Sequence, residues 1–253
     1  MNTPTDNEQS LEHGHRPDEI RERLAAPYHH SYLRDFVYGA IDGTVTTFAV
    51  VSGVAGADLD VSIVLILGTA NLVGDGFSMA AGNFLGTRTE QQVLERTQQM
   101  EEQHIDRNPD GEREEIRQIF AAKGFSGSDL ERVVEVITAD RQLWVQTMLT
   151  DEHGLSLGRA QPMKAAVVTF VAFLLAGLLP LLPFIAFYFD AFSGTPYLPS
   201  ALLTGVAFFL IGTMKSRFVD QHWGWAGLET LGVGGAAAFL AYVIGILLKG
   251  IAI

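Results

Sequence analysis

Four side chains able to bind metal recur at every fourth position of one apolar stretch: Asn71, Asp75, Met79 and Asn83. Residues four apart lie on one face of a helix, so these four would form a single stripe. Carboxylate and amide oxygens are hard ligands for divalent cations, and a thioether adds a softer one. An unpaired polar group is costly in hydrocarbon, so the stripe must face protein or water. It predicts either a path for metal ions or a row of helix–helix hydrogen bonds.

The preceding apolar stretch carries a second stripe at helical spacing, made of Asp35, Tyr38, Asp42 and Thr46. Gly39 and Gly43 flank Asp42, which lets a neighbouring helix approach closely. An aspartate inside a membrane span is by default a functional-site hypothesis, and the alternative is a local cap or ion pair. Only a short turn, residues 56–60, separates the two stretches. We therefore expect antiparallel neighbours whose polar stripes could face each other.

The helices that must position these side chains are membrane spans. The chain has 253 residues, of which 48% are hydrophobic. Long stretches with very few charges lie at residues 36–57, 61–86, 165–189, 198–211 and 228–248. The longer ones have the roughly 20 residues that a spanning helix needs. The sequence therefore predicts an all-α polytopic membrane protein with five transmembrane helices and a helical domain inserted between the second and third.

Composition divides the chain into four predicted parts: a polar N-terminal tail at residues 1–30, two spans at 31–88, an acidic helical domain at 89–160 and three spans at 161–253. The acidic domain holds eight basic and fifteen acidic residues. The tail histidines, His13, His15, His29 and His30, could bind metal weakly, although such tails are commonly just disordered.

Breaker and cap residues predict the helices. The second span has no breaker after Gly86 and should continue into solvent as far as Ile105. Residues 108–111, Asn-Pro-Asp-Gly, read as a turn. Three further helices are expected at residues 112–122, 126–138 and 140–152. Pro180 and Pro183 should kink or break the third span, because each removes a backbone donor.

Three pairs in the acidic domain have the spacing of ligands that share an ion: Glu101 with His104, Glu112 with Glu115, and Met148 with Glu152. Side chains three or four apart project from one helix face, as in the carboxylate metal sites of helical bundles. Carboxylates with imidazole suit first-row divalent metals, and a thioether favours softer ones. The alternative is an ordinary solvated acidic face.

Other chemistries fit the sequence less well. The absence of cysteine excludes disulfides and thiolate metal sites. A net charge of −12 argues against nucleic acid as a partner. No nucleotide-binding glycine loop or serine triad is present, so we expect no enzymatic activity.

Charge also predicts the orientation in the lipid bilayer. Lys and Arg are concentrated before the first span, between the second and third, and between the fourth and fifth, whereas the loops at 57–61 and 190–199 have none. The positive-inside rule then places the N-terminus and the acidic domain in the cytoplasm, and an odd number of spans places the C-terminus outside. Lys249 is the one charge against this assignment.

Three stretches resemble the vacuolar iron transporter family: YGAIDGTVTTFAVVSGVAG at 38–56, NLVGDGFSMAAGN at 71–83 and GLLPLLPF at 177–184. The resemblance covers essentially everything from about residue 31 to the C-terminus. It implies a five-span homodimer that exchanges cytosolic Fe²⁺, and often other divalent metals, for protons. It also implies a cytoplasmic helical domain that gathers metal on glutamates.

The resemblance also implies roles for particular residues. Asp42 and Met79 match the translocation pair of the family. The positions that match its cytoplasmic metal ligands are Glu101, Glu112, Glu115, Met148 and Glu152. His104 stands where a glutamate is expected, which puts the stoichiometry and pH dependence of that site in question. Asp75 resembles the bacterial-type motif, which favours the cell membrane over a vacuole.

Together these observations predict a proton-coupled transporter that moves divalent metal out of the cytoplasm. Fe²⁺ is the first choice of metal, while Mn²⁺, Co²⁺ and Zn²⁺ accept the same ligands. The predicted path comprises Asp42, Met79, Asp75, Asn71, Asp35 and Asn83. The alternative is a membrane-anchored metal-binding or sensor protein that does not transport.

Overall fold

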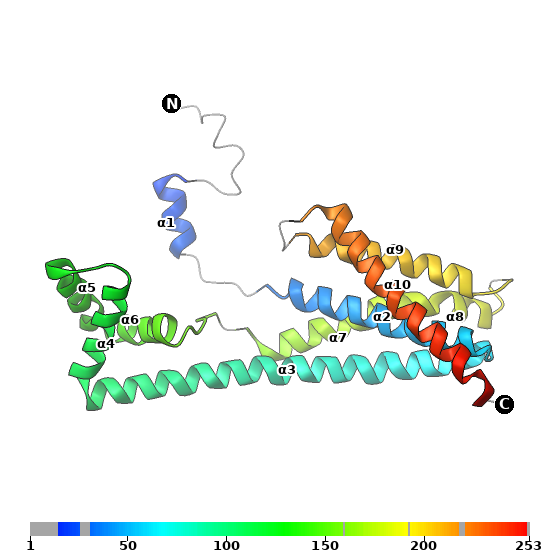
Figure 1. The fold of residues 1–253 in the computed structure, drawn as a ribbon, viewed down its shortest axis with the longest axis horizontal. Coiled ribbons are helices and arrows are strands. Elements are labelled where there is room, and N and C mark those ends of the chain that lie inside the picture. The colour runs from blue at the N-terminus through cyan, green and yellow to red at the C-terminus, as the bar shows by residue number, and fades with distance from the viewer. Residues whose placement is uncertain (1–14, 26–30, 159, 192, 218–220, 252–253) are drawn as a thin grey trace, which may run out of the picture. The chain divides into compact units, whose positions relative to one another are not determined.

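The fold is described from a computed structural model, which covers residues 15–25, 31–158, 160–191, 193–217 and 221–251. These residues are almost entirely helical and include no strand (Figure 1). The chain divides into two units, residues 1–30 and residues 31–253. Within the first unit, the described residues form one short helix, α1 (Pro17–Ala25). Of the tail histidines, His13, His29 and His30 lie outside the described residues.

Five helical segments of the second unit are long and apolar enough to cross a membrane. They are α2 (Leu33–Ala57), α3 (Val61–Arg107), the segment Pro162–Tyr188, α9 (Tyr197–Lys215) and α10 (Trp223–Leu248), which is followed by the short η3 (Lys249–Ile251). The predicted all-α membrane protein with five spans is confirmed.

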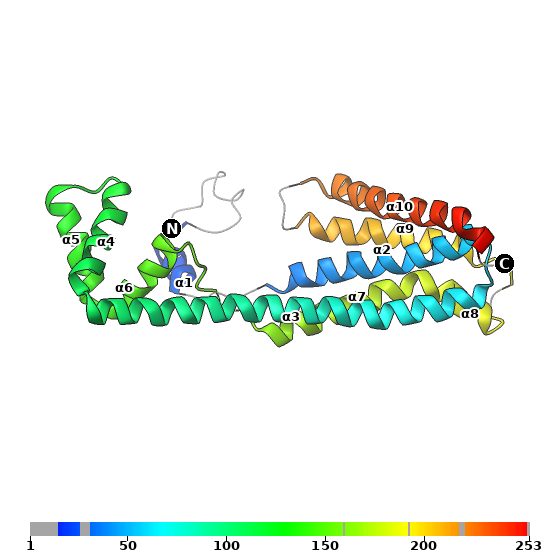
Figure 2. The same ribbon diagram turned by 60° about the horizontal axis from the view of Figure 1, so that its bottom comes forward.

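The second span is part of one 47-residue helix, α3. At 1.5 Å per residue it is about 70 Å long, more than twice the roughly 30 Å of a hydrocarbon core. Figure 2 shows it running uninterrupted from the bundle to the helices at the other end. The predicted continuation to Ile105 is confirmed, so the membrane part and the acidic part share one rigid rod.

Three helices and a π turn pack on the end of α3: α4 (Pro109–Ala122), α5 (Gly127–Ala139), α6 (Arg141–Thr147) and η1 (Met148–Glu152). We call these elements, with α3 from Thr89 onward, the acidic domain. Their apolar faces meet in one core that includes Ile116, Val134 and Trp144. Most of their charged side chains remain exposed, which is the amphipathic pattern of helices packed in water, whereas Glu101 and Glu112 are buried.

Two helix boundaries in this domain differ from the prediction. The predicted turn at residues 108–111 is mostly helical, because the Asn108 side chain accepts a hydrogen bond from Gly111 N at 3.3 Å and Pro109 begins α4. The helix predicted at 140–152 is α-helical only as far as Thr147 and then widens into η1. Such π turns often occur at functional sites.

Prolines divide the third span as predicted. Its α-helix α7 (Pro162–Leu178) gives way to a 3₁₀ turn, η2 (Leu179–Leu181), and then to α8 (Leu182–Tyr188). Ser200 of α9 donates a hydrogen bond to the Pro180 carbonyl at 2.6 Å. A neighbouring helix therefore satisfies part of the backbone at the break, as membrane helices require.

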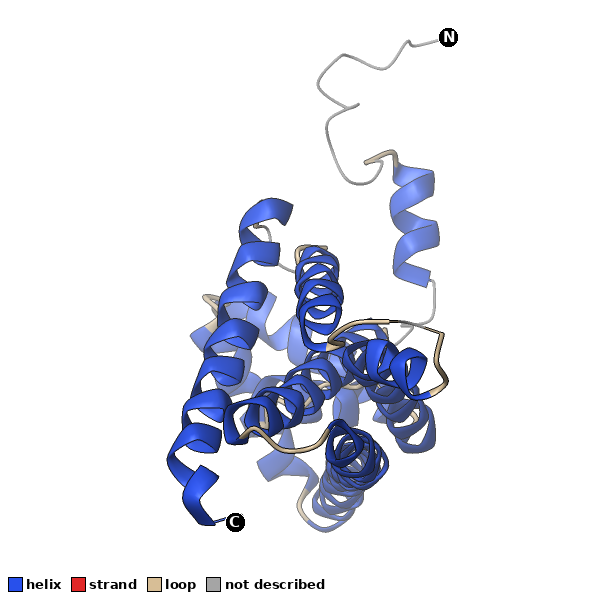
Figure 3. Ribbon diagram, turned by 90° about the vertical axis from the view of Figure 1, so that its right-hand side faces the viewer, coloured by secondary structure: helices blue, strands red, loops and turns tan. Residues whose placement is uncertain are grey.

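Helix α2 packs against α3, α7, α9 and α10. Figure 3 views the helices along the long axis of Figure 1. The glycines of α2 allow the close approach predicted for them. A Cβ atom at Gly39 would lie 2.5 Å from the Thr169 carbonyl oxygen, and one at Gly43 would collide with the Phe173 backbone. These contacts fix the face that α2 turns toward α7 and so direct its polar stripe toward α3.

Candidate metal path and metal centre

The two polar stripes face each other between α2 and α3. At one end, Asn71 Nδ2 donates to Thr46 Oγ1 at 3.4 Å, and at the other, Asn83 Nδ2 donates to Asp35 Oδ1 at 2.9 Å. Both contacts belong to one antiparallel register. Asp42 and Asp75 lie between these ends, close enough for their carboxylates to interact electrostatically. We call this row of facing side chains the polar seam.

Met79 lies one helical turn beyond Asp75 in the polar seam. Its side chain is half-buried and packs against the apolar cluster around Phe173 and Leu181. The thioether is therefore held in place by core packing while it remains next to the acidic part of the seam. This is a suitable position for a soft ligand beside hard ones.

Thr169 of α7 joins the seam and was missed by sequence reasoning. Asn83 Nδ2 also donates to Thr169 Oγ1 at 2.7 Å, and Thr87 Oγ1 donates to Asn83 Oδ1 at 3.4 Å. Thr169 is 1% exposed. The sequence signal was a lone hydroxyl in an apolar span, which is too common to single out.

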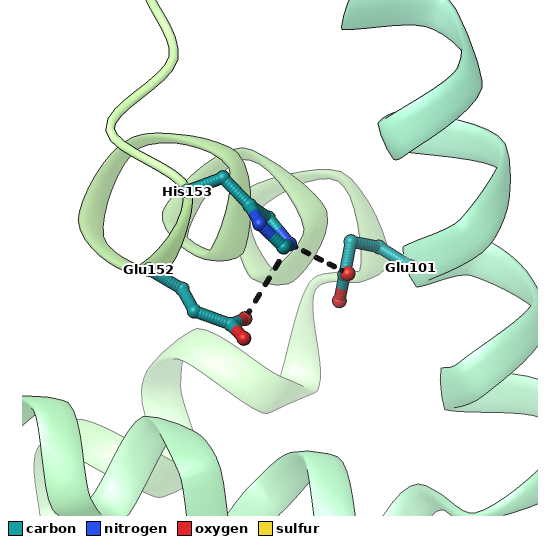
Figure 4. Close-up of side chains that lie close together, drawn as sticks. All are labelled: Glu101, Glu152 and His153. Atoms are coloured by element: carbon teal, nitrogen blue, oxygen red, sulfur yellow. Dashed lines mark hydrogen bonds and ion pairs between the residues drawn. The ribbon is translucent and has the colours of Figure 1, made fainter. Parts of the chain in front are cut away.

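A second cluster of ligand atoms lies in the acidic domain around Glu101. His153 Nε2 is 2.9 Å from Glu101 Oε1 and 3.6 Å from Glu152 Oε2 (Figure 4). On the other side, His104 Nδ1 is 3.4 Å from Glu112 Oε1. Each of two triplets has all its ligand atoms within 4.8 Å of one another: Glu101, Glu152 and His153; and Glu101, His104 and Glu112. Glu101 belongs to both, so the arrangement could hold two ions that share one carboxylate. We call these five residues the Glu101 cluster.

Burial makes it costly for the carboxylates of the Glu101 cluster to be ionised together. Glu101 is 2% exposed and Glu112 is 4% exposed, and each has one buried carboxylate oxygen without a hydrogen-bond partner. Burial, followed by the charges of Glu115 and Glu101, raises the pKa of Glu112 to about 7. Burial also raises the pKa of Glu152. Buried carboxylates this close need a proton or a cation between them, and the oxygen–nitrogen donor set fits a first-row divalent metal.

The predicted ligands do not all enter these triplets. Glu115 is exposed, and its charge acts on both Glu112 and Glu152. Met148 is completely buried in the apolar core of the domain. His153 was missed because the predicted pair, Met148 with Glu152, assumed an α-helix. In the π turn, His153 N donates to Met148 O at 3.2 Å, so the imidazole comes to the face where Glu101 lies.

Comparison with known proteins shows the class of protein to which this chain is similar. The chain is 35% identical over 225 residues to a vacuolar iron transporter of Toxoplasma gondii, covering 86% of this chain and 74% of that protein. It is 30% identical over 213 residues to vacuolar iron transporter 1 of Eucalyptus grandis, covering 83% of this chain and 84% of that protein. It is 29% identical over 217 residues to vacuolar iron transporter 1 of Arabidopsis thaliana, covering 84% of each. These relatives are membrane transporters and not enzymes.

The family follows from the sequence profile of the VIT family, which matches residues 33–246. The matched region includes four whole spans, the fifth except for its last two residues, and the whole acidic domain. The chain belongs to the VIT family, and it is a multi-pass membrane protein of metal transport.

Proposed function

We propose that this protein exchanges divalent metal, foremost Fe²⁺, for protons and moves the metal out of the cytoplasm. The observation that carries the proposal is the register of α2 against α3, which sets the carboxylates of Asp42 and Asp75 at matching positions within the membrane-spanning bundle. The relatives' names, vacuolar iron transporter, support Fe²⁺ as the substrate. Mn²⁺, Co²⁺ and Zn²⁺ accept the same ligands, so they are further candidate substrates.

The polar seam can perform exchange because its carboxylates accept either ion. A hydrated divalent cation cannot cross hydrocarbon unless protein oxygens replace part of its water shell. Asp42 and Asp75 repel each other when both are ionised, and either a metal ion or protons relieve the repulsion. The amide oxygens of Asn71 and Asn83 extend the polar surface along the bundle. Met79 favours softer metals over Mg²⁺.

The Glu101 cluster would gather metal from solution before it enters the seam. It would serve equally well in a sensor that binds metal without transport, which is the second candidate function. Sealed vesicles containing the purified protein separate the two. A transporter accumulates Fe²⁺ inside them, whereas a sensor binds Fe²⁺ and leaves uptake at the rate of empty vesicles.

Metal binding to the Glu101 cluster is expected to weaken as the solution becomes acidic. Glu112 has a pKa of about 7, so below pH 7 a metal ion must displace its proton. Affinity should then fall about tenfold per pH unit for each displaced proton and should change little between pH 7.5 and 8.5. Calorimetry with Co²⁺ on the full-length protein in detergent measures this dependence.

Two variants test whether Glu112 is the group that titrates: Glu112→Gln removes its carboxylate, and Glu135→Gln is the matched control. Glu112→Gln should bind more weakly at pH 8 and lose the pH dependence of the triplet that contains residue 112, whereas Glu135→Gln, at an exposed site of the same domain, should behave as wild type. Equal affinity at pH 6 and pH 8 in the wild-type protein would contradict the assignment of Glu112 as a ligand.

We also propose the orientation given by the basic loops, with the acidic domain in the cytoplasm and the C-terminus outside. The chain has no cysteine, so an introduced cysteine is the only residue that a maleimide can label. Ser193→Cys should react with an impermeant maleimide in intact cells, and Ser126→Cys should react only after lysis. Labelling of Ser126→Cys in intact cells would refute this topology.

The compartment is proposed from the sequence motif. Asp75 gives the bacterial-type version, which favours the cell membrane, whereas the relatives are named for the vacuole. Fractionation of membranes from the source organism, followed by detection of the protein in each fraction, distinguishes the cell membrane from a vacuolar membrane.

A homodimer is the proposed assembly. Gly74, Ser78 and Gly82 form an exposed small-residue face on α3, and nothing lies within 4 Å of a Cβ atom built at either glycine. Such faces allow membrane helices to approach closely. Oxidation of Ser78→Cys in membranes should give a covalent dimer, and Val206→Cys on α9 should not. A monomer in both variants would count against this interface.

A further inference from the structure

A cavity of about 440 Å³ lies between α2, α9 and α10 and is separate from the polar seam. Its polar rim contains Arg34, Lys215 and Glu229, and its apolar wall contains Val37, Ile41 and Val233. Arg34 lies in the first turn of α2, Lys215 in the last turn of α9 and Glu229 near the start of α10. The rim is therefore at the end of the bundle from which α3 continues into the acidic domain.

The tryptophans of α10 indicate the depth of this cavity in the bilayer. Trp223 and Trp225 begin the helix and are 57% and 64% exposed, as is typical of aromatic residues at the membrane–water interface. Glu229 lies about 6 Å along the helix from Trp225, and Val233 about 6 Å further. The charged rim thus falls at the level of lipid headgroups and the apolar wall at the level of acyl chains.

The rim carries a net positive charge. Lys215 Nζ pairs with Glu229 Oε2 at 3.0 Å, which leaves two of its N–H groups available. The Arg34 guanidinium lies over the Tyr38 ring, 5.4 Å from its centroid, and has no ion pair among the residues that the structure describes. One cation of the three charged groups is therefore uncompensated at a position next to lipid.

We propose that this cavity binds one anionic phospholipid per chain. The phosphodiester would accept hydrogen bonds from Arg34 and Lys215, and an acyl chain would lie along Val37, Ile41 and Val233. A lipid with a net charge of −1 neutralises the single excess positive charge of the rim. A zwitterionic headgroup has no net charge to do so, and a metal cation would be repelled by the rim. A soluble anion could contact only the charged rim, because it has no acyl chain to fill the apolar wall. This inference requires only that the protein spans a membrane and is independent of the proposed transport.

Native mass spectrometry of the full-length protein tests the proposal. The protein is exchanged into detergent with equal amounts of phosphatidylglycerol and phosphatidylcholine. We expect one retained phosphatidylglycerol per chain in preference to phosphatidylcholine. Each Lys or Arg near the surface strengthens binding of an anionic lipid about fivefold, so Arg34→Gln should lower retention by about that factor. Val233→Trp, which fills the apolar wall without a change of charge, should also lower it.

Lys164→Gln is the matched control, because Lys164 is an exposed cation near the start of α7 but does not line the cavity. Its retention should equal that of the wild type. Equal retention of the two lipids, or equal loss in Arg34→Gln and Lys164→Gln, would overturn the proposal. A disulfide between two Ile41→Cys chains without retained lipid would also overturn it, because a second copy would then occupy the cavity.

Discussion

Asp42→Asn is expected to lower metal transport on the order of 100-fold or more, because a charged contact in a desolvated site contributes up to about 3 kcal/mol. Asparagine keeps the shape of the side chain but cannot alternate between metal and proton. Metal binding by the acidic domain should remain unchanged, since the Glu101 cluster lies on other elements. Metal flux in vesicles and Co²⁺ calorimetry measure the two properties separately.

Asp190→Asn is the control for this substitution, because Asp190 is an exposed loop residue with a positive φ of 55° that asparagine also adopts. It should transport as wild type. If Asp42 only holds the bundle together, Asp42→Asn should lose its folded state, which size-exclusion chromatography would show. A folded Asp42→Asn protein with wild-type flux would contradict the assigned role.

Glu101→Gln should cause the largest loss of metal affinity in the acidic domain. Glu101 contributes to both triplets, whereas Glu152 and Glu112 each contribute to one. Groups that merely orient ligands already change affinity by about 10- to 100-fold, so we expect a loss of about 100-fold or more in both sites. Calorimetry should show one weakened site in Glu152→Gln and two in Glu101→Gln.

The same substitution should stabilise the metal-free domain. Glu101 is buried beside the carboxylates of Glu112 and Glu152, so a neutral amide there removes charge repulsion, while its oxygen can still accept a hydrogen bond from His153. Glu95→Gln, at an exposed position of the same helix, serves as the control and should change neither property. Unchanged affinity in Glu101→Gln would show that the cluster is an acidic face without a metal.

Periodicity and breakers predicted the five spans and most of the helices of the acidic domain, but not the helical start at Pro109 or the π turn after Thr147. The spacing of Asp35, Asp42 and Thr46 on α2 and of Asn71 and Asn83 on α3 predicted both stripes. Tyr38, which was expected in the first stripe, is instead exposed and lies under Arg34. The short turn between the helices left one way for them to meet. Pro180 and Pro183 predicted the break in the third span. These features are local, so the sequence contains them directly.

Contacts between distant elements could not be predicted in this way. His153 reaches Glu101 across 52 positions of the sequence, and only the packing of η1 against α3 brings them together. The π turn also changes which side chains share a face after Met148, so α-helical spacing gave Glu152 but not His153. Thr169 also enters the seam through packing between distant elements. Close packing at Gly39 sets the register of α7 against α2.

Metal flux coupled to proton flux is the most direct test of the account. The purified protein is reconstituted into sealed vesicles that contain a pH-sensitive dye, and Fe²⁺ is added outside under reducing conditions. The account predicts faster Fe²⁺ uptake when the vesicle interior is made acidic, together with a rise in internal pH as the metal enters. Uptake that is independent of the pH gradient and leaves the internal pH unchanged would contradict it.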